Sequence, residues 1–284
     1  MRRYLALGFW GLTLVFSAFF AHAEMEDSQI HKIPVEDLAR EMTLRYQALK
    51  PSQWREHGSG IVSVLPEQPY YDLTPAEEVN AWPTSGRGQL SQRGVALTLD
   101  ACDAKTDLRI IALLRELRLP AAIFVTNRWL QSNAALAAEL ADDPQFSLEA
   151  HGVQHRPASV TARAAYGIRG TSSIAALVDE VENNARAIAA ATGKRPRWYR
   201  SGTAFYDDVA LLVIQDLGFS VAGYSISADQ GASLPAKTVA QRMLMAKDGD
   251  ILLIHVNRPQ SGVFEGLKEA LPKMIEAGVN FVGL

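Results

Sequence analysis

The chain has 284 residues, of which 48% are apolar and 21% charged, a composition typical of a globular protein that can bury a core. Its formal net charge of -3, with no basic stripe interleaved with aromatic residues, excludes a general attraction to nucleic acid. A single cysteine rules out an internal disulfide, so the predicted core must hold the fold by itself.

Residues 1–23 have the pattern of an export signal. Arg2 and Arg3 precede an apolar run over 5–20, and the stretch 21–23, A-H-A, fits a cleavage site. We therefore expect cleavage after Ala23, a periplasmic or secreted protein, and no stable membrane insertion afterwards. A retained membrane anchor is the alternative, although the run is slightly shorter than the roughly 20 residues that span a bilayer.

Residues 24–93 form the second predicted unit, an N-terminal flanking segment. One helix is predicted over 35–49, where apolar side chains recur at helical spacing from Leu38 to Leu49. Prolines and glycines after Pro51 interrupt any sustained period, which predicts an irregular segment wrapped on the main domain.

Residues 94–284 form the predicted main domain, in which short apolar runs alternate with helical patterns. The predicted strands cover 95–100, 121–125, 146–150, 198–199, 219–226, 251–254 and 279–284. Helices are predicted over 108–117, an alanine-rich stretch ending at Leu140, 174–191 with Gly193 as its C-cap, 208–217, 235–246 and 264–277. This alternation predicts an α/β fold of parallel strands joined by right-handed helical crossovers. A nearly closed barrel and an open doubly wound sheet both fit, but no glycine-rich phosphate loop follows the first strand, which favours the barrel.

Polar side chains follow most of the predicted strands. They are Asp100 and Asp103 after the first strand, His151 and His155 after the third, Arg200 after the fourth, Asp229 after the fifth and His255 after the sixth. In parallel (β/α) barrels, the loops at the carboxyl ends of the strands carry the catalytic groups. We therefore expect these side chains to converge on one rim.

His151 and His155 stand four residues apart, a spacing that lets two imidazoles bind one metal ion. A carboxylate from another strand would complete a three-ligand site with one open position. Zinc in such a site lowers the pKa of bound water to about 7, which makes a nucleophile available at neutral pH. The pattern therefore predicts Zn2+, or another divalent transition metal, as the cofactor.

The same residues resemble five ordered motifs of the polysaccharide deacetylase family, over roughly 94–284. The stretch 98–101, T-L-D-A, is similar to the first motif, threonine-phenylalanine-aspartate-aspartate, and the stretch 151–155, H-G-V-Q-H, is similar to the second. Arg200, Asp229 and His255 resemble the charged residues of the third, fourth and fifth motifs. The resemblance implies a distorted (β/α) barrel of about seven parallel strands and metal-dependent removal of acetyl groups from N-acetylated sugars.

The resemblance also implies a role for each motif residue, and each role has a physical reason. Asp100 would be the general base that takes a proton from the attacking water, and Arg200 would keep it ionised. The two histidines of the second motif would hold the metal ion. His255, as imidazolium, would protonate the departing amine, and Asp229 would orient His255 or support Arg200.

The first motif departs from the family pattern. Where the family has its second aspartate, normally the third metal ligand, this chain has Ala101. Asp103 lies two positions later and supplies the missing oxygen if the chain turns back after the strand. Otherwise Asp100 itself binds the metal, water fills the gap, or the site is weakened. Cys102, which precedes Asp103, is either a nucleophile paired with a histidine or a small buried hydrophobic residue.

The sequence thus predicts an exported, metal-dependent hydrolase that deacetylates a polysaccharide or oligosaccharide substrate. The same machinery would also serve an O-acetyl esterase on a polysaccharide. A third interpretation is a non-catalytic carbohydrate-binding protein with a degenerate metal site, as Ala101 and Val256 indicate, since both stand where the family has aspartate. No pattern in the sequence specifies the oligomeric state.

Overall fold

The computed structural model describes residues 32–56 and 94–284. Its centre is a sheet whose strands follow the order β10-β11-β2-β3-β4-β7-β9, with β12 paired to β2. In chain order these strands are β2 (Val95–Ala101), β3 (Ala121–Val125), β4 (Phe146–Ala150), β7 (Trp198–Tyr199), β9 (Ser220–Val221), β10 (Ile226–Ser227), β11 (Ile251–His255) and β12 (Phe281–Val282). Every pair in this sheet is parallel, which confirms the predicted parallel α/β fold.

The sheet is curled, because its two edge strands are neighbours in the chain. β9 ends at Val221 and β10 begins at Ile226, so about five residue steps, at most about 17 Å, connect the two edges. A flat sheet of seven strands spaced about 4.8 Å apart would hold its edges about 29 Å apart. The edges must therefore bend toward each other, which confirms the predicted distorted (β/α) barrel. β9 and β10 are not hydrogen-bonded neighbours, so the barrel stays open along a seam formed by residues 222–225.

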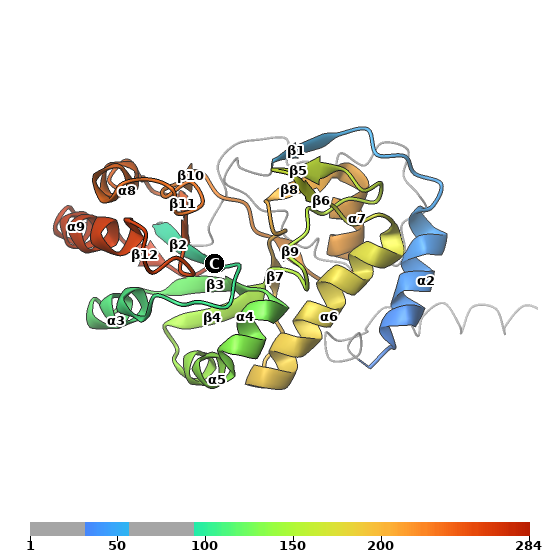
Figure 1. Ribbon diagram of the computed structural model, residues 1–284, viewed down its shortest axis with the longest axis horizontal. Helices are drawn as coiled ribbons and strands as arrows, with labels where there is room; N and C mark the ends of the chain where they lie inside the picture. Colours follow the sequence, from blue (N-terminus) through green and yellow to red (C-terminus); the bar gives the residue numbers. More distant parts are fainter. Residues whose placement is uncertain (1–31, 57–93) are drawn as a thin grey trace, which may run out of the picture.

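Helices cover the outside of the curled sheet (Figure 1). They are α3 (Leu108–Glu116), α4 (Asn127–Ser132), α5 (Ala134–Asp142), α6 (Ile174–Thr192), α7 (Asp208–Asp216), α8 (Ala236–Met243) and α9 (Val263–Glu276). Alternate residues of β2, among them Leu97, Leu99 and Ala101, belong to the apolar core between sheet and helices. The residues between them, Thr98 and Asp100, face the barrel interior and contact polar groups there.

Local sequence explains most helix boundaries. Side-chain oxygens of aspartate or serine cap the first turns of α3, α6 and α7. Gly193, with a φ of 72°, ends α6 in the left-handed conformation, as predicted. The helix predicted up to Leu140 is wrong in one respect, because Asn133 leaves the helical conformation and separates α4 from α5. Its side-chain Nδ2 donates to the backbone oxygen of Ala104 at 2.8 Å, which holds the break in place.

The strand predicted over 219–226 is interrupted in the structure. The backbone oxygens of Ala222 and Gly223 accept hydrogen bonds from the guanidinium of Arg200, with Nε–O and Nη2–O distances of 3.2 and 2.9 Å. These carbonyl oxygens therefore accept hydrogen bonds from a buried side chain instead of from a neighbouring strand. Arg200 holds the seam of the barrel in this way.

Two parts of the N-terminal segment pack on the barrel. α2 (Val35–Tyr46) lies against α6 and α7, and it ends three residues before the predicted end at Leu49. β1 (Trp54–Glu56) pairs antiparallel with β8 (Phe205–Asp207). A small hairpin of β5 (Ala164–Ala165) and β6 (Ile168–Arg169) lies in the loop after β4.

The predicted export signal over 1–23 lies outside the described residues. Within the described ranges, no helix has both the length and the apolar character needed to cross a membrane.

Candidate active site

The carboxyl ends of the parallel strands meet at one rim of the barrel. Asp100 lies near the end of β2 and His255 ends β11, and the sheet register places the two side by side. The segments directly after β4, β7 and β10 reach the same rim. The structure thereby brings together most of the residues predicted from the sequence, namely Asp100, His151, His155, Arg200, Asp229 and His255.

Arg200 is a fully buried cation inside the barrel. Its Nη1 lies 2.7 Å from Oδ1 of Asp100 and 3.0 Å from Oγ1 of Thr98, while Nε and Nη2 bond the carbonyl oxygens at the seam. The guanidinium also lies over the ring of Phe124, 4.2 Å from the ring centroid. Each guanidinium nitrogen has an acceptor, which is the condition under which a charge is tolerated in a core.

Asp100 is held in its ionised form. Burial alone would raise the pKa of this carboxyl group, but Arg200, followed by His151 and His255, lowers the pKa below its usual range. Arg200 fixes one carboxylate oxygen, and the other, Oδ2, lies 3.5 Å from Nε2 of His151. One oxygen of the carboxylate is therefore anchored, and the other is turned toward the histidines.

His151 is buried and presents its Nε2 to the site. Its Nδ1 lies 2.8 Å from the backbone oxygen of Arg200, and because a carbonyl oxygen only accepts, Nδ1 carries a proton. Asn184 on α6 fixes the backbone here, since its Oδ1 accepts from the N–H groups of His151 and Gly152 at 2.9 and 3.0 Å. Burial alone would lower the pKa of His151, but the neighbouring charge of Asp100 and the contact with Cys102 raise it.

His155 has a left-handed backbone conformation, with a φ of 59°, which is uncommon outside glycine. Glu180 on α6 helps to impose it, because its Oε1 accepts from the backbone N–H groups on either side of His155 at 2.9 and 3.1 Å. Gly202 leaves the necessary room, since a Cβ there would lie 2.3 Å from the carbonyl carbon and oxygen of His155. The imidazole centroids of His151 and His155 are 4.9 Å apart, with an interplanar angle of 85°.

Asp229 holds His255 at two points. Its Oδ1 lies 2.9 Å from Nδ1 of the imidazole, and its Oδ2 accepts from the backbone N–H of His255 at 2.6 Å. Burial alone would lower the pKa of His255, but Asp229 more than offsets this and holds the pKa well above its usual range. The sequence suggested His255 or Arg200 as the partner of Asp229, and in the structure Asp229 contacts His255.

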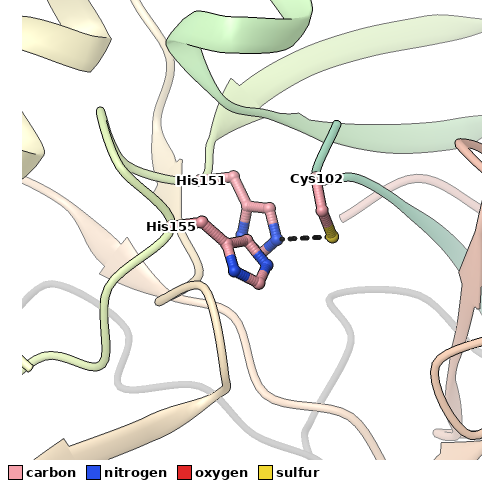
Figure 2. Close-up of side chains that lie close together, drawn as sticks. All are labelled: Cys102, His151 and His155. Atoms are coloured by element: carbon pink, nitrogen blue, oxygen red, sulfur yellow. Dashed lines mark hydrogen bonds between the residues drawn. The ribbon is translucent and has the colours of Figure 1, made fainter. Parts of the chain in front are cut away.

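The sulfur of Cys102 lies beside the two histidines of the second motif, as Figure 2 shows. Its Sγ is 3.5 Å from Nε2 of His151. Burial alone would raise the pKa of the Cys102 thiol, but His151, followed by His155 and His255, lowers it well below its usual range. This cysteine therefore lies in an electropositive position and does not simply fill space in the core.

Two groups of side chains within the described residues lie close enough together to hold a metal ion. Cys102, His151 and His155 form one, and Asp100, Cys102 and His255 form the other, with ligand atoms within 4.8 Å of one another in each. Asp103 belongs to neither group. Its Oδ1 lies 3.0 Å from Nε of Arg128 and 2.7 Å from the backbone nitrogen of Ala104, and 34% of its side chain is exposed.

Cys102 and Asp103 follow directly after β2 and lie in different surroundings. Thr98, Asp100 and Cys102 occupy every second position, so Cys102 continues the interior side of β2. Asp103 lies in the bend after the strand, where its carboxylate contacts Arg128. The period of two was present in the sequence and would have drawn attention to the cysteine.

A cleft of ≈ 440 Å³ opens in front of Asp100, His155 and His255. One wall contains Glu56, the last residue of β1, whose Oε1 accepts from the hydroxyls of Tyr166, at 3.3 Å, and Tyr224. The pairing of Glu56 with Tyr224 was not predicted from the sequence, because the two residues are 168 positions apart and no local pattern connects them. The N-terminal segment therefore shapes the cleft.

A curled parallel barrel with ionised carboxylate, imidazole and thiol groups at its rim defines a class of proteins whose active sites lie at the carboxyl ends of the strands. Comparison with protein families shows which family within this class the chain resembles. The family model described as polysaccharide deacetylase matches residues 87–222, a range that contains the first three motifs. This match confirms the resemblance to the polysaccharide deacetylase family that the motifs predicted. No curated protein matches the sequence.

Several solved structures share this fold. The wild-type BA3943 protein, described as a CE4 family pseudoenzyme from Bacillus anthracis, is 22% identical over 70% of this chain and 66% of its own, with a TM-score of 0.59. A BA3943 mutant, described as a pseudoenzyme with restored enzymatic activity, is 24% identical over 70% and 68% of the two chains, with a TM-score of 0.58. PdaA of Bacillus subtilis, a family 4 carbohydrate esterase, is 20% identical over 69% and 81%, with a TM-score of 0.57. The present chain thus spans about two thirds of the length of the BA3943 chains.

Proposed function

We propose that the protein is a metal-dependent hydrolase that removes acetyl groups from N-acetylated sugars of a glycan. The observation that carries this proposal is a pair of opposite charges at one cleft: Asp100 held as a carboxylate by Arg200, and His255 held as an imidazolium by Asp229. Amide hydrolysis needs one group to accept a proton from the attacking water and another to protonate the departing amine. Asp100 and His255 stand beside each other on adjacent strands and meet this need.

The low pKa of Asp100 explains why the reaction would require a metal. A carboxylate whose pKa lies below its usual range is a weak base, so it removes a proton only from water that has been made unusually acidic. A divalent metal ion supplies that acidity and also polarises the acetyl carbonyl. The anchored position of Asp100 then lets its Oδ2 take the proton, while Arg200 keeps the other oxygen in place.

The residues present fit a zinc-type ion. His151 uses Nδ1 to donate to the Arg200 carbonyl and offers Nε2 to the site, which is the arrangement that fixes a metal-ligating imidazole. His155 lies next to it, with its backbone set by Glu180 and Gly202. Two imidazoles with one further ligand and an open position match the ligand number of catalytic zinc sites.

His255 would provide the proton for the leaving amine. Its Nδ1 is bonded to Asp229, which leaves the other ring nitrogen to deliver the proton. The raised pKa favours the protonated ring, which is the form that can donate a proton to the departing amine.

A sugar substrate is supported by the family match and by the shape of the cleft. Tyr166 and Tyr224 line it and offer aromatic surface for a sugar ring. Among proteins with the same fold, Bc1960 is described as a peptidoglycan N-acetylglucosamine deacetylase, at 17% identity and a TM-score of 0.57. The predicted signal over 1–23 supports export, and N-terminal sequencing of periplasmic or secreted protein should then begin at Glu24.

Acetate release from oligomers of N-acetylglucosamine tests the proposal. The zinc-loaded protein should release acetate, lose this activity on chelation and regain it when zinc is restored. Asp100→Asn and His255→Gln should each lower kcat by about 10²–10⁴-fold, the contribution of a positioned base or acid. Asp248→Asn, at the opposite end of β11, is the matched control and should keep the wild-type rate. Full activity in the chelated protein or in both site variants would refute the mechanism.

Acetate-release and binding assays on the same protein preparation distinguish two other functions. An O-acetyl esterase would release acetate from acetylated xylan and leave N-acetylglucosamine oligomers intact. A non-catalytic carbohydrate-binding protein is favoured by Ala101 and Val256 and by the pseudoenzyme among the similar structures. Such a protein would bind the oligomers in a calorimeter, even with excess zinc, without releasing acetate.

A further inference from the structure

The sulfur of Cys102 occupies the position that a third metal ligand would need. It lies at the same rim as His151 and His155, and the ligand atoms of the three side chains are within 4.8 Å of one another. The Sγ–Nε2 distance to His151 is 3.5 Å, on the side of the imidazole that is not bonded to the Arg200 carbonyl. Figure 2 shows the sulfur and the two rings converging.

The obvious rival ligand, Asp103, is directed elsewhere. It lies in the bend that follows β2, and 34% of its side chain is exposed. Its carboxylate contacts Arg128 and the backbone nitrogen of Ala104. Bringing it to the histidines would require breaking these contacts and reversing the chain after β2, whereas Cys102 needs no such change.

A second grouping of the same sulfur, with Asp100 and His255, is less suited to hold the metal. Asp100 has one oxygen committed to Arg200, and His255 has Nδ1 committed to Asp229. Using the remaining atoms as ligands would consume the base and the acid of the proposed reaction. The grouping with His151 and His155 leaves both free.

We propose that Cys102 is the third protein ligand of the metal, as a thiolate in a Cys-His-His site with His151 and His155. This inference rests on the metal dependence of the proposed function and specifies its ligand set. One thiolate and two imidazoles favour Zn2+ and Co2+ over Mg2+, Ca2+ and Mn2+, which prefer oxygen ligands. Cys102 thus takes the ligand role that the family assigns to the aspartate at position 101. Because sulfur is a softer ligand than oxygen, the metal preference changes accordingly.

The competing interpretation is that Cys102 is a nucleophile with His151 as its base. The short Sγ–Nε2 contact fits that arrangement too. The two differ in one testable respect. A nucleophile would form a thioester with the acetyl group and would release acetate without metal, whereas a ligand would remain unacetylated.

Cobalt substitution in the full chain tests the proposal by spectroscopy, independently of activity. The wild-type protein with one equivalent of Co2+ should show a thiolate-to-cobalt charge-transfer band in the near ultraviolet. X-ray absorption of the zinc-loaded wild type should show a sulfur neighbour at about 2.3 Å beside nitrogen neighbours at about 2.0–2.1 Å. These two measurements need no variant, so they do not depend on whether a variant folds.

Two substitutions then assign the signal to one residue. Cys102→Ser should abolish the band and weaken zinc binding by at least about 100-fold, the upper end of what loss of an outer-shell partner costs. Asp103→Asn, the variant for the rival ligand, should retain both the band and the zinc affinity.

Each contrary outcome has a separate meaning. Bound cobalt without the band, together with only nitrogen and oxygen neighbours of zinc, would overturn the thiolate ligand while leaving the metal-dependent hydrolase intact. A thioester on Cys102 formed in the chelated protein would overturn the ligand in favour of the nucleophile. Failure of the wild type to bind any zinc or cobalt would overturn this inference and the proposed function together.

Discussion

At the scale of single residues, the contact between Asp229 and His255 sets both the orientation and the charge of the imidazole. The carboxylate bonds the ring at Nδ1 and the backbone of the same residue, so the ring has little freedom to turn. The same carboxylate raises the pKa of His255 against the opposing effect of burial. Geometry and acidity at this position therefore depend on one side chain.

Replacing Asp229 with asparagine should shift the pH dependence of the reaction. In the wild type, the proposed activity should persist toward alkaline pH, because the raised pKa of His255 favours the protonated ring. Without the charge of Asp229, burial dominates and the pKa of His255 falls. The alkaline limb of the kcat/KM profile should then move to lower pH, and kcat near the wild-type optimum should fall by about 10²-fold.

The acidic limb provides the internal reference for this experiment. It reports the pKa of Asp100, which is set chiefly by burial and by Arg200, so it should stay in place in Asp229→Asn. Asp248→Asn should leave both limbs unchanged. An unaltered alkaline limb in Asp229→Asn would show that His255 is not the acid.

At the scale of elements, α6 is the platform for the loop that carries the two histidines. Glu180 and Asn184 stand four residues apart on the helix, so they lie on the same face and bond successive N–H groups of the loop. The segment after β7 closes against the other side of the loop through Gly202. The left-handed conformation of His155 is maintained between these two elements.

Gly202→Ala should displace His155 without removing any polar group. The added Cβ would lie 2.3 Å from the carbonyl group of His155, and that backbone must shift to relieve the overlap. We expect zinc affinity, measured by competition with a chromogenic chelator, to fall by about 10–100-fold. Gly283→Ala, where a Cβ would meet nothing within 4 Å, is the matched control. Equal affinities in the two variants would mean that this contact does not position the ligand.

At the scale of the whole molecule, α2 joins the N-terminal segment to the barrel. Met42 on its inner face is 1% exposed and belongs to the same apolar core as the sheet and the outer helices. Arg45 and Tyr46 of α2 both contact the carboxylate of Asp216 on α7. These contacts predict that α2 and the barrel unfold together.

Met42→Ala tests this cooperative unit. Truncation of a buried methionine should lower the free energy of unfolding by about 2–5 kcal/mol, with one transition in urea and an unchanged m-value. Leu44→Ala, at a position 66% exposed, should cost much less. A wild-type-like midpoint for Met42→Ala, or a separate early transition, would show instead that α2 folds independently of the barrel.

Much of the fold could be predicted from the sequence, because parallel strands buried on both faces form continuous apolar runs, as β2, β3 and β11 do. The errors have long-range causes. The run over 219–226 is interrupted because Arg200 binds its carbonyls, and the hairpin of β5 and β6 has no apolar alternation to announce it. Neither feature is encoded locally.

The candidate site could be predicted as a set of strand-end residues, since parallel topology alone brings Asp100, Arg200 and His255 together. The pairing of Asp229 with His255 required the actual positions of β10 and β11. Glu56 required the docking of β1 on β8. The two-residue period of the strand indicates that Cys102 points into the site. The family motif has aspartates here, so the prediction considered carboxylates as ligands and not the cysteine.

The position of Cys102 also makes the site chemically unique within the chain. It is the only cysteine among 284 residues, and it is partly exposed at the rim. A maleimide or mercurial reagent therefore labels a single known point beside the proposed reactive centre, without any engineered background. In the exported protein proposed above, the same feature would create a vulnerability, because peroxide converts thiolates to sulfenic acid and, irreversibly, to sulfonic acid. A catalyst that depends on one sulfur atom would lose its activity in proportion to the oxidant that it meets.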